Sequence, residues 1–93
     1  MIKATFVKDI QNNRSSEKLY RLSEPVETDD GDTTEYVVIS ALASAMDTGM
    51  PETYIFPADS DGNITGWGEM DGSYRGGTSH EKAIADAGWE LAQ

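Results

Sequence analysis

Residues 35–42 read EYVVISAL, and this run decides the fold that the sequence predicts. Its segment Tyr36-Val37-Val38-Ile39 is aromatic and β-branched, which favours a strand over a short helix. Because successive side chains of a strand point to opposite faces, an unbroken apolar run needs cover on both of them. We therefore expect residues 35–42 to form the central strand of a sheet whose two faces are both at least partly covered.

Further extended runs lie on either side of this strand in the sequence. Residues 2–7 alternate apolar and polar side chains, as expected of a half-buried strand. Residues 18–23 are predicted to form a second strand, which Pro25 either ends or places at a sheet edge. Residues 53–57, TYIFP, resemble the central strand in composition, and residues 89–91 alternate again and predict a short last strand.

The sequence predicts a helix over residues 79–87. Thr78 is expected to cap it, with Glu81 three residues later reaching back as in a capping box. Gly88 supplies the residue type that commonly ends a helix in the left-handed conformation. One face of this helix should dock on the sheet. That face holds His80, Ala83, Ile84 and Ala87.

The order of these elements predicts an α+β fold in a single small domain, residues 1–93. Strands joined by short turns pair more readily as hairpins than through parallel crossovers. We therefore expect a mainly antiparallel sheet of four to six strands, with one C-terminal helix packed on one face. The predicted core comprises Ile2, Ala4, Phe6, Leu19, Val38, Ile55, Ile84 and Trp89.

Residues 57–68, PADSDGNITGWG, present two alternatives, a calcium loop and a turn. Asp59, Asp61 and Asn63 alternate as the first ligands of an EF-hand do. Counting from Asp59, however, the sixth and twelfth residues are isoleucine and methionine, where such a loop needs glycine and glutamate. Asp61-Gly62 between two extended runs is typical of a hairpin, because glycine tolerates a positive φ. We therefore predict a turn and no metal site.

The glycine-rich segment 66–77 lacks the signature of a known phosphate-binding loop. It matches neither the P-loop nor the dinucleotide-binding pattern. Gly76-Gly77 ahead of a helix, with Arg75 beside them, could bind an anion through free backbone amides. The alternative, which we prefer, is a flexible approach to the helix cap. We therefore expect no cofactor.

The sequence offers no catalytic constellation. It contains no cysteine, so disulfides and thiolate metal sites are excluded. His80 is the only histidine, and adjacent residues such as Ser79 do not face each other on a helix. Carboxylates are too abundant for any pair of them to indicate acid–base chemistry. We therefore expect a protein that is not an enzyme.

Charge is the strongest compositional signal, because the chain carries a net charge of −10 and distributes it unevenly. Residues 22–74 hold twelve acidic residues and no Lys or Arg, and the acids are densest near the loop predicted at residues 28–34. Direct nucleic-acid binding needs clustered basic residues and is not expected. An acidic surface instead attracts basic protein partners, unless it serves only solubility. The candidate partner-binding residues are Asp29, Asp30, Asp32, Asp59, Asp61 and Glu69.

The sequence also predicts where the protein is found. The N-terminal residues, MIKATFVKDIQNN, lack the unbroken apolar core of a signal peptide. No stretch approaches the roughly 20 apolar residues of a membrane span. We therefore expect a cytoplasmic protein that does not act at a membrane.

Residues 52–89 carry a resemblance to a known group of proteins. The features are a Tyr-Ile-Phe-Pro strand, an Asp-Gly turn, a Gly-Ser-Tyr-Arg-Gly-Gly link and a Ser-His-Glu helix closing in Ala-Gly-Trp. In these features the chain resembles small acidic uncharacterised proteins of tailed phages that infect actinobacteria. The resemblance implies expression in the cytoplasm of an infected bacterium and a role accessory to virion assembly, and it implies no catalytic residues.

Two functions from different classes fit these observations. The first is a non-enzymatic, phage-like accessory protein that binds and modulates a host or phage protein through its acidic surface. In a sharper variant of this function, the carboxylates imitate the phosphates of a nucleic acid. The second is a minor structural or assembly protein that forms a homo-oligomer. The sequence leaves the oligomeric state open.

Overall fold

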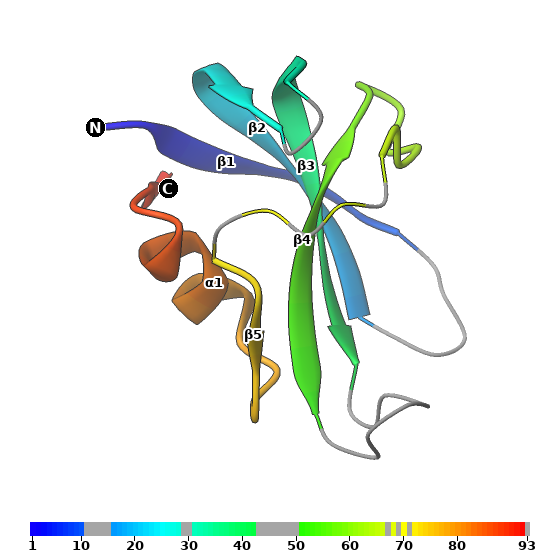
Figure 1. The fold of residues 1–93 in the computed structure, drawn as a ribbon, viewed down its shortest axis with the longest axis vertical. Helices are drawn as coiled ribbons and strands as arrows, with labels where there is room; N and C mark the ends of the chain where they lie inside the picture. Colours follow the sequence, from blue (N-terminus) through cyan, green and yellow to red (C-terminus); the bar gives the residue numbers. More distant parts are fainter. Residues whose placement is uncertain are drawn as a thin grey trace.

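The part of the chain that the structure describes is mostly strand and forms a curled sheet with one short helix. The computed structural model describes residues 1–10, 16–28, 31–42, 51–66, 68, 70 and 72–92. Within these ranges, six strands form one sheet in the order β5-β4-β3-β2-β1-β6 (Figure 1). The elements are β1 (Lys3–Ile10), β2 (Ser16–Glu27), β3 (Thr33–Leu42), β4 (Glu52–Ala58), β5 (Tyr74–Arg75), α1 (His80–Asp86) and β6 (Glu90–Ala92).

Strand β3 is the central strand, as its apolar run predicts. It pairs antiparallel with β2 on one side and with β4 on the other. Val37, Val38 and Ile39 are all fully buried. Val37 and Ile39 belong to one apolar cluster and Val38 to a second. Both faces of β3 are therefore covered, which confirms the expectation drawn from its sequence.

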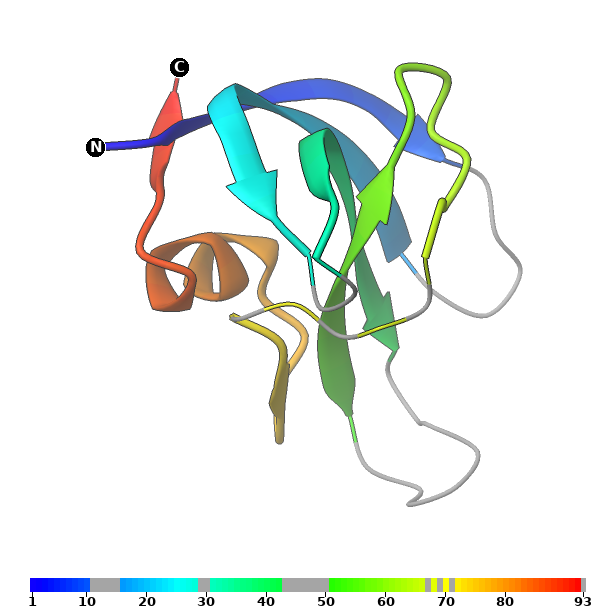
Figure 2. The same ribbon diagram turned by 45° about the horizontal axis from the view of Figure 1, so that its top comes forward.

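The sheet is mixed, because the last strand adds to it in parallel. The pairs from β1–β2 through β4–β5 are antiparallel, whereas β6 lies parallel to β1 along residues 3–5. Since β5 and β6 are the two edges and α1 lies between them in sequence, the chain passes from one edge to the other through α1 (Figure 2). The predicted last strand exists, displaced by one residue.

The larger apolar cluster joins the sheet and the helix. Ala83 and Ile84 of α1 are buried in the same cluster as Val37, Ile39 and Ile55. Ala4, Leu19, Val38, Ile55 and Ile84 of the predicted core are fully buried or nearly so, whereas Ile2 and Trp89 are partly buried against this cluster. Five further members of this cluster were not among the predicted core residues: Tyr20, Leu22, Val37, Ile39 and Met70.

The prediction that Phe6 is buried is wrong, because its side chain is 46% exposed. The register of β1 against β2 shifts between Phe6 and Lys8, so a bulge interrupts the alternation at this point. β6 also pairs β1 only as far as Thr5. Phe6 therefore lies beyond the covered part of the strand, where its ring makes an edge contact with Tyr20 at 5.9 Å between centroids.

A second apolar cluster lies on the other face of the sheet. Leu19, Val38 and Ala58 are buried there. The turn at residues 59–63 folds over this cluster, since a Cβ built on Gly62 would lie 3.0 Å from Cδ1 of Ile10. Turn and sheet are therefore in direct contact, and the turn is part of the packing.

Two predicted boundaries differ from the structure. Pro25 does not end the second strand, because β2 continues to Glu27 through an irregularity between Arg21 and Val26 that interrupts the ladder around the proline. The helix is capped by Ser79 and not by Thr78: the Ser79 backbone is extended, and its Oγ accepts from the Lys82 amide at 3.1 Å. In the described part of the chain, no helix is long and apolar enough to cross a membrane.

Candidate functional site

The predicted turn is organised around the carboxylate of Asp59. Its Oδ1 accepts hydrogen bonds from the amides of Asp61 at 3.0 Å and Asn63 at 2.9 Å, and its Oδ2 accepts from the Asn63 side chain at 3.3 Å. The Gly62 amide donates to the Asp59 carbonyl at 3.1 Å, with φ of +92° at Gly62. An isolated bridge between Ala58 and Ile64 closes the hairpin. The turn prediction is confirmed.

These hydrogen bonds make the turn sensitive to acid. The backbone hydrogen bond from Asn63, followed by those from the Asn63 side chain and Asp61, lowers the pKa of Asp59 below its ordinary value. A carboxylate with a lowered folded-state pKa stabilises the protein above its unfolded pKa, and this contribution is lost as the pH falls through the folded value. Asp59→Asn should therefore be less stable than the wild type at neutral pH.

The measurement is the urea midpoint of wild type and Asp59→Asn, followed from neutral pH to below the lowered folded-state pKa of Asp59. The two midpoints should converge at the acid end, because the wild-type carboxylate is then protonated and has lost its advantage. A difference that stays constant over this range would show that the charged carboxylate does not hold the turn.

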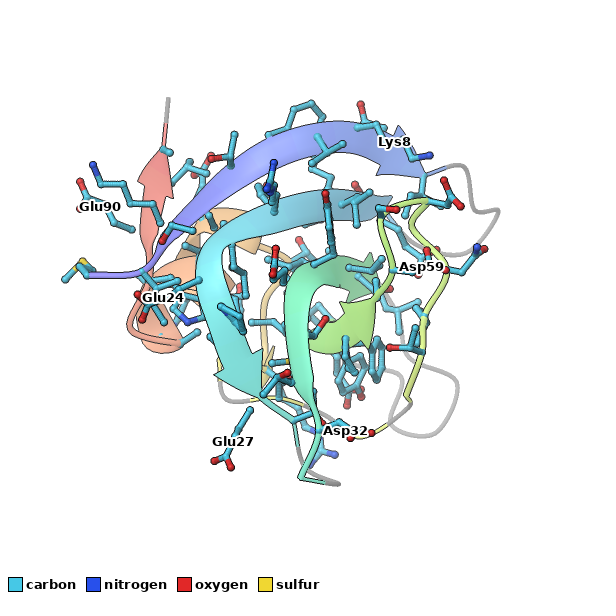
Figure 3. All side chains as sticks on the ribbon, turned by 90° about the horizontal axis from the view of Figure 1, so that it is seen from above. Lys8, Glu24, Glu27, Asp32, Asp59 and Glu90 are labelled. Atoms are coloured by element: carbon cyan, nitrogen blue, oxygen red, sulfur yellow. The ribbon has the colours of Figure 1, made fainter. Side chains whose placement is uncertain are left out.

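A hollow of about 430 Å³ lies between the β2–β3 connection and the turn. Three acidic residues line it: Asp32 at the end of that connection, Glu35 in β3 and Asp59 in the turn. Threonines are frequent among the other lining residues, and none of the described lining residues is Lys or Arg. Figure 3 shows Asp32 and Asp59 on these two separate segments. We call this feature the acidic hollow.

The framework of the hollow is fixed by backbone pairing. Tyr36 of β3 lies opposite Ala58 of β4, so the start of β3 is held beside the end of β4. Oγ1 of Thr34 lies within hydrogen-bond distance of two carbonyl oxygens, that of Tyr36 at 2.7 Å and that of Ala58 at 3.1 Å. A further backbone hydrogen bond joins the two ends of the β2–β3 connection, since the Thr28 amide donates to the Asp32 carbonyl at 2.8 Å.

The structure brings together two of the residues that the sequence predicted as partner-binding. Asp32 and Asp59 line the same hollow, and Asp61 is exposed on the adjoining turn. Glu35 also lines the hollow and was missed, because its place at the start of a strand gave no sign of a site. The other candidates lie outside the described residues. They are Asp29, Asp30 and Glu69.

Carboxylates and hydroxyls in an open hollow can accept hydrogen bonds from a guanidinium or ammonium group. Among the described residues, no group of three His, Asp or Glu side chains is arranged to hold a metal ion. An Arg or Lys side chain is the ordinary protein source of such a guanidinium or ammonium group.

Arg75, the cation considered for anion binding, is already paired. Its Nε lies 3.0 Å from Oε1 of Glu52, whose side chain is only 2% exposed. This pair joins β4 to β5 at the sheet edge, where the two residues lie opposite each other. The Arg75 guanidinium therefore neutralises a buried carboxylate, which weakens the case for an anion site at Gly76-Gly77.

No family model matches the chain, and neither curated protein sequences nor solved structures give a match.

Proposed function

We propose that this chain is a non-enzymatic, phage-like accessory protein that binds a basic region of a host or phage protein through the acidic hollow. The observation that carries the proposal is the meeting of Asp32, Glu35 and Asp59 around one hollow that no described Lys or Arg lines. The net charge of −10 supports it, because a field of one sign steers an oppositely charged partner toward the surface.

We also propose a position for the helix: α1 packs on one face of the sheet, on the side opposite the turn. The shared burial of Ala83, Ile84 and Ile55 supports this placement. With the helix in this place, the acidic hollow lies on the part of the sheet that is away from α1. The phage resemblance supports a location in the cytoplasm of an infected bacterium.

The first test is binding of an arginine-rich peptide, used as a probe because the natural partner is not identified. The variant Asp32→Asn/Glu35→Gln removes two charges from the hollow and leaves Asp59 to hold the turn. We expect slower association and a flatter dependence of the association rate on ionic strength, because long-range attraction acts mainly on the association rate.

The matched control is Glu24→Gln/Glu90→Gln, which removes the same charge from exposed positions. Figure 3 shows Glu24 and Glu90 on the side of the view opposite Asp59. The control should bind nearly as the wild type does. Equal losses in the two double variants would mean that only net charge matters, and the acidic hollow would lose its assigned role.

A second candidate function, a homo-oligomeric assembly protein, is favoured by a different observation. Phe6 and Val7 of β1 are 46% and 44% exposed, and within the described residues no strand pairs the outer edge of β1 beyond Thr5. Exposed apolar side chains beside an open sheet edge favour association. Sedimentation of the wild type and Phe6→Ser separates the candidates, since only the assembly protein should form an oligomer that the substitution weakens.

A further inference from the structure

The tip of the turn carries a dipeptide with its own chemistry, Asp61-Gly62. Asp61 is exposed, and in the described part of the chain its carboxylate takes part in no hydrogen bond or ion pair. Gly62 has no Cβ to hinder approach to its amide nitrogen. An unrestrained carboxyl group next to a glycine amide is the arrangement from which an aspartate cyclises onto its own backbone.

We infer that Asp61 is a site of spontaneous isoaspartate formation, and that Asp59 is the positioning residue that restrains the reaction. In the first step the Gly62 nitrogen attacks Cγ of the protonated Asp61 carboxyl group. A C–N bond forms, a C–O bond breaks, and the hydroxyl leaves with the amide proton as water. In the second step water opens the resulting imide at the main-chain carbonyl, so the chain then runs through Cγ. No oxidant or further reactant is needed.

The folded turn opposes the first step in two ways. The Gly62 amide is engaged with the Asp59 carbonyl at 3.1 Å, and Asp59 Oδ1 also holds the amide of Asp61. Gly62 is in addition packed over Ile10 and Leu19 of the second apolar cluster. Before the Gly62 nitrogen can reach Cγ, its hydrogen bond to Asp59 must break and Gly62 must move away from Ile10 and Leu19. The reaction rate should therefore follow the fraction of molecules in which the turn is open.

The product would alter the surface that the turn supports. An isoaspartate adds one carbon to the main chain at position 61 and leaves the carboxylate on a shorter branch. The turn could then no longer hold Gly62 over Ile10 and Asp59 in its present place. The inference does not depend on the proposed binding function, since it concerns the chain alone.

The test is a time course of the full-length protein at neutral pH and body temperature. Isoaspartate is detected by enzymatic methylation and localised by peptide fragmentation. Localisation is essential, because Asp30-Gly31 and Asp71-Gly72 have the same sequence chemistry and their aspartates lie outside the described residues. We expect isoaspartate at position 61 in the wild type, a several-fold faster appearance in Asp59→Ala, and none at this position in Asp61→Glu.

Two controls keep the test decisive. The urea-unfolded wild type gives the unrestrained rate at position 61, and it should exceed the native rate. Ile84→Ala lowers global stability at a distant site, so it separates local from global opening. The inference is overturned if native wild type and Asp59→Ala react at the same rate, or if Ile84→Ala, matched to Asp59→Ala in stability, accelerates position 61 equally.

Discussion

Gly72→Ala is expected to lower the free energy of unfolding by about 3 kcal/mol, through backbone strain and overpacking together. Gly72 has a φ of +103°, and a Cβ built on it would lie 2.5 Å from the Ala83 carbonyl oxygen of α1. The same Cβ would lie 2.8 Å from Cδ1 of Ile55 and 2.9 Å from Cβ of Ala87. Because one of the overlapping atoms belongs to the helix backbone, a side-chain rotation cannot relieve the contact.

Gly72 cannot move away easily, because its neighbours are tied to β4. The Met70 amide donates to the Ile55 carbonyl at 2.9 Å, and the Ile55 amide donates to Oγ of Ser73 at 2.9 Å. Further along, the Gly76 amide donates to the Pro51 carbonyl at 2.7 Å. These hydrogen bonds fix the residues on both sides of Gly72, so Gly72 stays close to α1.

The chain provides a matched control for this prediction. Gly76 has a φ of +95°, close to that of Gly72, and a Cβ built on it meets no atom within 4 Å. Gly76→Ala should therefore lower the free energy of unfolding only by the cost of a positive φ, roughly 1–2 kcal/mol. Urea unfolding of both variants measures the difference. Equal losses would contradict the close packing of Gly72 against α1.

Ile84→Ala is the second large effect, with an expected loss of about 3 kcal/mol. Ile84 is 1% exposed and belongs to the cluster that includes Val37, Ile39 and Ile55. Truncation removes buried apolar surface and leaves a cavity that the β-sheet can only partly fill. The test therefore measures how firmly α1 packs on the sheet.

A graded pair makes this test more specific. Ile84→Val removes a single methyl group and should cost about 1 kcal/mol, so the two losses should scale with the volume removed. Thermal or urea unfolding measures both. An unchanged melting temperature in Ile84→Ala would contradict the docking of the helix, whatever the valine variant shows.

The elements that were predicted well are those that a short stretch of sequence specifies by itself. The apolar run of β3 indicates a buried strand and the Asp-Gly pair indicates a turn, and both elements are present. Gly72 had no such signal, because its importance depends on contacts with Ala83 and Ile55 that the fold creates. The exposure of Phe6 likewise follows from a bulge and from the short length of β6, and neither feature alters the alternation of residues 2–7.

The acidic hollow could be predicted only in part. The composition identified Asp32 and Asp59 as candidates, each on its own segment. That they line one hollow follows from the register that sets Tyr36 opposite Ala58, and strand register cannot be read from composition. Asp59 also has a structural role, because its carboxylate holds the turn. The charge pattern alone could not distinguish this role from partner binding.

Backbone amide shifts in a nuclear magnetic resonance titration test the central claim most directly. The arginine-rich peptide is added to labelled wild-type protein at low salt. Saturable shift changes should concentrate at residues 32–35 and 57–66, on the two sides of the acidic hollow, and should shrink in Asp32→Asn/Glu35→Gln. Changes spread evenly over the acidic surface, or centred on α1 and unaltered in that variant, would contradict the account.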